Sequence, residues 1–113
     1  MAKLTATLHG DFYTIIADLE KTVMNGSVSA SKEESVQYAR NGVQSYLGIF
    51  ERFSYAGGNR VSMSISLFGD DEYSNLCVVT SGGSTGTFFK INTWGEETFL
   101  ETIQACVRKY ELR

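Results

Sequence analysis

Few residues in this sequence have the chemistry for catalysis or metal binding, and they are widely spaced. His9 is the only histidine, which excludes a metal centre built on several imidazoles. A catalytic triad would have to use this one residue, which we expect to point into solvent from the first strand. Cys77 and Cys106 lie far apart with no CxxC spacing, so we interpret both as reduced, buried thiols. We therefore expect no metal site and no cofactor.

One glycine-rich segment, residues 81–86, has the composition of a phosphate-binding loop. Its glycines would let backbone amides converge on an anion. A P-loop, however, needs Lys followed by Ser or Thr at the start of a helix, whereas residues 87–92 have the pattern of a strand. We interpret residues 81–86 as a hairpin turn. The acidic groups at 70–72 and 96–97 lack the ligand spacing of a calcium loop.

The clearest structural signal is residues 61–67, in which apolar residues alternate strictly with serines. This period of two predicts a strand with one buried face. Asp11 is a suitable N-cap for a helix that ends at Asn25-Gly26, with Gly26 left-handed. Thr93 and Glu96 form a capping box for a second helix. Further strands are predicted at residues 3–9, 43–55, 75–81 and 87–92.

Residues 27–42 are ambiguous. Two short strands joined at residues 32–34 fit the alternation of apolar and polar side chains. Ser31 and Glu34 could instead begin a short helix that ends at Asn41-Gly42. We favour the two strands.

The predicted fold class is α+β, with a single domain over residues 1–113. The element order β-α-β-β-β-β-β-β-α gives an antiparallel sheet of six to seven strands with both helices packed on one face. This order resembles the helix-grip arrangement of the Bet v 1 and START-like superfamily. That resemblance implies a ligand site between the sheet and the C-terminal helix, although this shorter chain would leave only a small or filled cavity.

The pairing of residues 43–55 with 61–68 sets which side chains face the helices. A three-residue loop, Gly57-Gly58-Asn59, pairs Tyr55 with Val61, Phe53 with Met63 and Glu51 with Ile65, which gives a mainly apolar face. Glu51 then points toward the helices, unless a local bulge returns it to solvent. The opposite face would expose aromatic and basic side chains: Tyr46, Phe50, Arg52 and Phe68.

Composition narrows the class of partner. The net charge of −3, with ten basic residues scattered among thirteen acidic ones, argues against binding to nucleic acid. We find neither the apolar core of a signal peptide nor an apolar run long enough for a membrane span. We therefore expect a cytoplasmic protein that does not bind membranes.

Two segments carry a resemblance to a known family. Residues 51–62 and the block from Thr80-Ser81-Gly82-Gly83-Ser84 through Phe88–Glu97 look like those of small bacterial proteins, chiefly from clostridial-type species, classed as a domain of unknown function. The resemblance spans nearly the whole chain. It implies a bacterial cytoplasmic protein and supplies no activity, cofactor or site residue.

Three functional hypotheses follow. The first is a non-enzymatic module that binds a small, partly apolar ligand between the sheet and the C-terminal helix, lined by Glu51, Phe53, Tyr55, Met63 and Phe89. The second is a homodimer or partner-binding protein that uses the face of Tyr46, Phe50, Arg52 and Phe68. The third is a small enzyme with Glu51 as general base, for which we can place no second catalytic group.

Overall fold

One antiparallel sheet and two helices make up the described part of the chain. The computed structural model describes residues 1–53, 59–82 and 89–112, with the backbone alone over 89–94. Along the chain the elements are β1 (Ala2–His9), α1 (Phe12–Asn25), β2 (Ser31–Arg40), β3 (Val43–Phe53), β4 (Arg60–Gly69), β5 (Tyr73–Gly82) and α2 (Phe89–Tyr110). The fold class is therefore α+β, as predicted. The predicted number of six to seven strands is wrong, because the described residues form a sheet of five.

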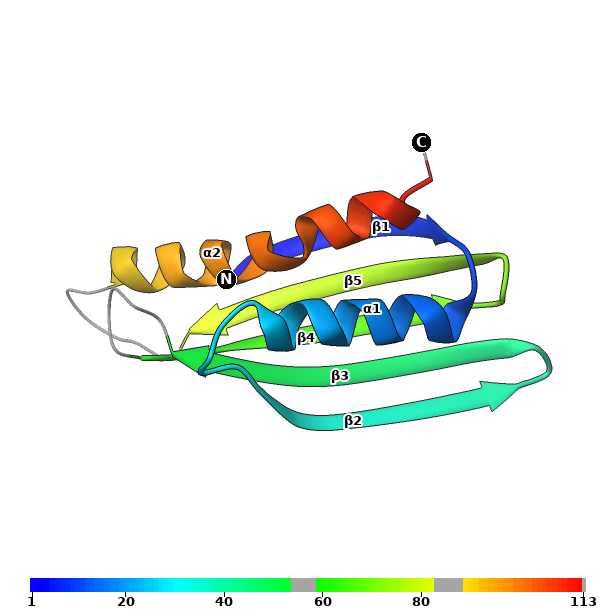
Figure 1. Cartoon of the computed structure of the whole chain (residues 1–113), viewed down its shortest axis with the longest axis horizontal. Helices are drawn as coiled ribbons and strands as arrows, with labels where there is room; N and C mark the ends of the chain where they lie inside the picture. The colour runs from blue at the N-terminus through cyan, green and yellow to red at the C-terminus, as the bar shows by residue number, and fades with distance from the viewer. Residues whose placement is uncertain (54–58, 83–88, 113) are drawn as a thin grey trace.

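The strands lie side by side in the order β1-β5-β4-β3-β2, and every neighbouring pair is antiparallel. Because β1 and β2 form opposite edges, α1 must cross the sheet between them, as Figure 1 shows. The four strands from β2 to β5 are joined in sequence, as in a meander. Strand β1 joins them by pairing with β5, so the N-terminal strand lies beside the last strand of the chain.

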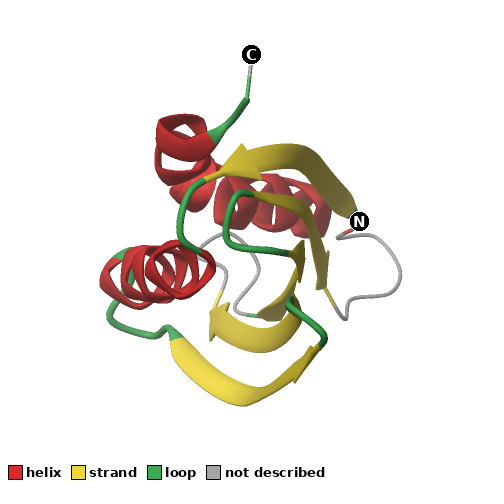
Figure 2. Ribbon diagram, turned by 90° about the vertical axis from the view of Figure 1, so that its right-hand side faces the viewer, coloured by secondary structure: helices red, strands yellow, loops and turns green. Residues whose placement is uncertain are grey.

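Both helices pack on one face of the sheet, which we call the inner face. The sheet is curved, and the end-on view places α1 within its curve (Figure 2). The serine-alternating strand β4 buries Val61, Met63, Ile65 and Leu67 on this inner face. They meet the apolar stripes of α1 and α2, including Leu19, Phe99 and Ile103. The prediction of an antiparallel sheet with its apolar side beneath both helices is confirmed.

Helix α1 begins as its sequence predicts. The Asp11 carboxylate accepts a hydrogen bond from the Thr14 backbone N–H at 2.9 Å, which satisfies one of the free donors at the helix start. The predicted left-handed Gly26 is wrong. Its φ of −77° is right-handed, and its N–H bonds to the Val23 carbonyl. The helix therefore ends by tightening its last turn.

Three predicted strands are corrected. Residues 31–40 form one strand, and the expected junction at 32–34 is a register shift between Lys32 and Glu34 that breaks the alternation. The expected strand at 87–92 is wrong from residue 89 onward, because α2 begins at Phe89. Thr93 and Glu96 accordingly lie within the helix. A short apolar run fits a buried strand or a helix equally well, which explains the error.

The predicted register of β3 on β4 is also wrong. Phe50 pairs with Met63, Glu51 with Ser62 and Arg52 with Val61. This shift exchanges the two faces of β3, because side chains alternate along a strand. Tyr46 and Phe50 are buried on the inner face, and burying each large aromatic contributes roughly 2–3 kcal/mol. The glycines of the predicted loop lie outside the described residues.

Candidate functional site

The face of the sheet opposite the helices, here called the outer face, is free of charge at its centre. Three neighbouring strands contribute nine outward positions in three cross-strand rows. Solvent-facing sheet surfaces ordinarily carry polar and charged side chains, so a neutral centre with exposed apolar groups is a candidate binding surface. The nine residues are Ser45, Leu47 and Ile49 of β3, Ser64, Ser66 and Phe68 of β4, and Asn75, Cys77 and Val79 of β5.

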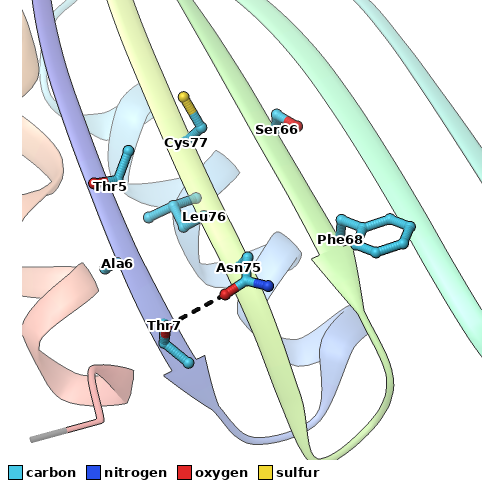
Figure 3. A pocket seen from close by; sticks show the side chains of 8 residues that line it. All are labelled: Thr5, Ala6, Thr7, Ser66, Phe68, Asn75, Leu76 and Cys77. Atoms are coloured by element: carbon cyan, nitrogen blue, oxygen red, sulfur yellow. Dashed lines mark hydrogen bonds between the residues drawn. The ribbon is translucent and has the colours of Figure 1, made fainter.

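A groove of about 590 Å³ lies on this outer face, over β1, β5 and β4 (Figure 3). None of the residues that line it is charged, and two of them, Ala6 and Leu76, direct their side chains to the core on the inner face. The other side chains combine hydroxyl, amide and thiol groups with an aromatic ring, and the pairing of β1 with β5 brings their strands together. The lining residues are Thr5, Ala6, Thr7, Ser66, Phe68, Asn75, Leu76 and Cys77.

The polar groups of the groove are partly held by one another. The Thr7 hydroxyl donates to the Asn75 side-chain oxygen over 3.2 Å. The Asn75 NH₂ group is then directed away from Thr7, toward the side of the groove where Phe68 stands (Figure 3). An amide held in this orientation offers its two N–H donors to a bound molecule.

Phe68 and Cys77 supply the apolar part of the groove. The Phe68 side chain is 54% exposed and stands beside small residues, so it forms a wall rather than part of the core. Cys77 is half-buried, and Ser66 pairs with it across the β4–β5 ladder. Phe68 is exposed, as the sequence predicted, while its role in an interface stays a prediction.

Glu51 lies on the outer face rather than toward the helices. Its carboxylate forms an ion pair with Arg60, whose guanidinium also lies 3.5 Å from the Glu33 carboxylate. Glu51 pairs with Ser62 on β4, and Arg60 lies at the start of the same strand, so the neighbours of the Glu51 carboxylate on β4 are polar. The general-base hypothesis rested on a carboxylate among apolar neighbours, and that environment is not what surrounds Glu51.

The residues predicted to line a ligand site do not share one surface. Phe53 lies on the outer face, 52% exposed, with the Arg60 guanidinium 5.6 Å from its ring centre. Met63 is fully buried on the inner face. Tyr55 lies outside the described residues, as does the side chain of Phe89. Phe53 and Met63 therefore lie on opposite faces of the sheet, and a role in ligand binding for any of these residues stays a prediction.

Three of the four residues predicted on an exposed interface are instead inside. Tyr46 and Phe50 are almost completely buried, and Arg52 is only 9% exposed. The Arg52 guanidinium lies 4.5 Å from the centre of the Phe99 ring, a cation–π contact that makes burial of its charge tolerable. The predicted register placed Arg52 on the outer face. The observed register pairs it with Val61 and places it on the inner face beside Phe99.

A polar cluster between the two helices is structural in character. Asp18 of α1 accepts hydrogen bonds from Lys109 at 2.5 Å and Tyr110 at 2.7 Å in α2, and these lower the pKa of its carboxyl. Burial raises the pKa of the nearby Cys106 thiol, which makes it a poor nucleophile. The described residues hold no group of three or more His, Cys, Asp or Glu arranged to bind a metal ion.

Apart from Phe68, the groove residues were missed in the sequence, because residues distant along the chain form the groove together. Thr5 and Thr7 are remote in sequence from Asn75 and Cys77, and only the β1–β5 pairing places them together. The strand at residues 3–9 was predicted, and in the structure Thr5 and Thr7 alternate there with Leu4, Ala6 and Leu8, which pack toward the core. The local sequence pattern gave no indication that this strand would pair with β5.

The comparisons with known proteins concern the family alone. A family model described as "Family of unknown function (DUF6054)" matches residues 1–111. A comparison with curated proteins gave no significant match. None of the described helices is both long and apolar enough to cross a membrane. Because the family model covers nearly the whole sequence, the chain belongs to the DUF6054 family, whose function is unknown.

Proposed function

We propose that this protein is a non-catalytic binding module that holds a small, neutral, partly apolar molecule in the outer-face groove. The observation that carries the proposal is the uncharged lining, in which an oriented amide and several hydroxyls surround an aromatic wall. Ligand sites are typically apolar clefts with a few convergent polar groups, and this groove has that composition.

Size and charge define the class of ligand. A volume near 590 Å³ falls within the roughly 300–1,000 Å³ of small-molecule sites. A charged ligand would leave water for a surface without a counter-charge, which is unfavourable. A molecule with one aromatic or aliphatic ring and a carbonyl group suits the groove, because the carbonyl can accept from the Asn75 NH₂ while the ring rests against Phe68.

The proposal keeps the class of ligand predicted from the sequence and moves the site to the other face of the sheet. On the inner face, large side chains from both helices fill the space over β4, including Leu19, Phe99 and Ile103 against Met63 and Ile65. Their complete burial favours a packed core there.

Titration with a neutral fragment tests this proposal. Benzamide combines a ring with an amide carbonyl, and benzoate is its charged counterpart of nearly the same shape. In ¹H–¹⁵N spectra of the labelled protein, benzamide should shift the amide signals of Thr5, Ser66, Asn75 and Cys77 in a saturable manner, with millimolar affinity expected for a fragment of this size. Benzoate should produce much smaller shifts at the same concentrations.

Two matched variants identify the surface. Cys77→Phe fills the groove and should abolish the benzamide shifts. Val79→Phe adds the same ring two residues along the same strand and face, outside the lining, and should leave the shifts in place. Equal responses to benzamide and benzoate, or loss of binding in neither variant, would contradict the proposal.

A further inference from the structure

Strand β2 is an open edge of the sheet for most of its length. Among the described strands it pairs with β3 alone, and nearly all of its side chains are exposed. Its N-terminal half carries a register shift at Glu33, with Lys32 ion-paired to Glu20 and Glu33 to Arg60. The second half, residues 35–40, pairs regularly with β3. An unprotected regular edge is a template for another strand.

The hairpin turn fixes which backbone groups of β2 face outward. Asn41 and Gly42 both have positive φ, 54° and 80°, as in a two-residue type I′ turn between the paired residues Arg40 and Val43. Such a turn hydrogen-bonds its flanking residues to each other. Counting back by two, Tyr38 and Val36 bond toward β3, while Ala39, Gln37 and Ser35 direct their N–H and C=O groups to the open edge.

One contact supports this assignment independently. The Ser35 N–H donates to the carboxylate of its neighbour Glu34 over 3.0 Å. A donor engaged in the β2–β3 ladder would not be available for that bond. The edge group of Ser35 is therefore satisfied by a side chain within its own strand, which a pairing strand can displace.

We propose that β2 pairs antiparallel with β2 of a second copy of this chain, about a two-fold axis through Gln37. This register opposes Gln37 to Gln37 and Ser35 to Ala39 of the second copy, so all three outward-facing residues on each strand are used, with about six backbone hydrogen bonds. The two sheets become one continuous antiparallel sheet.

The side chains on the outer face are complementary in that register and in no neighbouring one. Glu34 faces Arg40 of the second copy and Val36 faces Tyr38, each pair occurring twice by symmetry. Opposite charges and aromatic with β-branched side chains are the favourable cross-strand pairs. Shifting the axis by one residue position in either direction would place Glu34 against Tyr38, or Val36 against Arg40. The exposure of Tyr38, at 70%, fits a side chain that is covered on assembly.

The opposite edge of the sheet does not offer the same surface. Along β1, the Leu112 N–H donates to the Thr7 carbonyl at 2.9 Å, and Glu111 bridges to Leu8. The C-terminal residues thus occupy part of that edge. The groove residues lie on β1, β4 and β5, so the dimer does not depend on the proposed ligand site.

A charge-reversal cycle tests the register by light scattering and sedimentation. Glu34→Arg or Arg40→Glu alone creates two repulsive pairs and should weaken dimerisation roughly thirtyfold, whereas the double variant restores both pairs and the affinity. Glu101→Arg, an exposed reversal on α2, should have no effect. A wild-type protein that stays monomeric at high concentration overturns the proposal, as does a double variant no better than the singles.

The Gln37→Pro variant distinguishes loss of pairing at the open edge from loss of the fold. Proline removes an N–H that faces the open edge and leaves the ladder with β3 intact, a position where sheets tolerate it. The variant should be monomeric with an unchanged circular dichroism spectrum. In the wild type, hydrogen exchange at the Gln37 amide should slow as protein concentration rises. Concentration-independent exchange there, or a dimer retained in a folded Gln37→Pro variant, would show that another surface assembles the protein.

Discussion

The side chain of Tyr46 runs over the backbone of Gly48, two residues away on the same strand. A Cβ at residue 48 would overlap the Tyr46 hydroxyl and lie 2.7 Å from its ring carbon Cζ. From this position the hydroxyl donates to the Glu20 carboxylate at 2.6 Å, and Lys32 of β2 pairs with the same carboxylate at 3.0 Å. The absence of a side chain at Gly48 therefore makes room for the Tyr46 ring, whose hydrogen bond to Glu20 joins β3 to α1.

Gly48→Ala should destabilise the protein by about 2 kcal/mol, because the added methyl forces Tyr46 out of its position in a packed core. Chemical denaturation with circular dichroism measures the change. In a Tyr46→Phe background, which removes the overlapping hydroxyl, Gly48→Ala should cost less. Additive effects of the two substitutions would show that the hydroxyl is not what fills the space above Gly48.

Alkaline pH should weaken the fold through Tyr46. Burial and the neighbouring Glu20 carboxylate raise the pKa of its phenol well above the ordinary value of 10. The unfolded chain therefore releases its proton first, and the free energy of unfolding should fall as pH rises above about 10. Tyrosine absorbance during alkaline titration should show this phenol ionising only with unfolding. In Tyr46→Phe the stability should depend less on pH over that range.

Acidic pH should weaken the contact between the helices. Hydrogen bonds from Lys109 and Tyr110 lower the pKa of Asp18, so its contribution is present at neutral pH and is lost as pH falls below about 4, the unfolded value. Asp18→Asn should cost about 1 kcal/mol at pH 7, since the pair is partly exposed. Between pH 5 and 2 the variant should lose less stability than the wild type. Parallel profiles would contradict this role.

The two cysteines should differ in reactivity. Cys77 is half-buried in the groove, whereas Cys106 is 4% exposed and burial raises its pKa. In the native protein, N-ethylmaleimide should modify Cys77 alone, as peptide mass spectrometry after a timed reaction will detect, and both thiols should react in denaturant. Modification of Cys106 at a similar native rate would show that the helices open readily at that contact.

Local patterns predicted much of this fold. The alternation in β4 gave its buried face, and Asp11 with its apolar stripe gave α1. Strand β3 could not be oriented in the same way, because Tyr46 and Phe50 alternate with Leu47, Ile49 and Phe53, and either set can form an apolar face. The choice depends on Phe99 and α1, which are remote in sequence. The groove was not predictable for a similar reason, since it requires β1 beside β5.

The most direct test of the central claim is a set of nuclear Overhauser effects between bound benzamide and the side chains of the labelled protein. The proposal predicts cross-peaks from the benzamide ring protons to the Phe68 ring, the Thr5 and Thr7 methyl groups and the Cys77 Hβ protons. Cross-peaks to inner-face side chains such as Met63 and Ile103, or none to the groove under conditions where the amide signals shift, would contradict it.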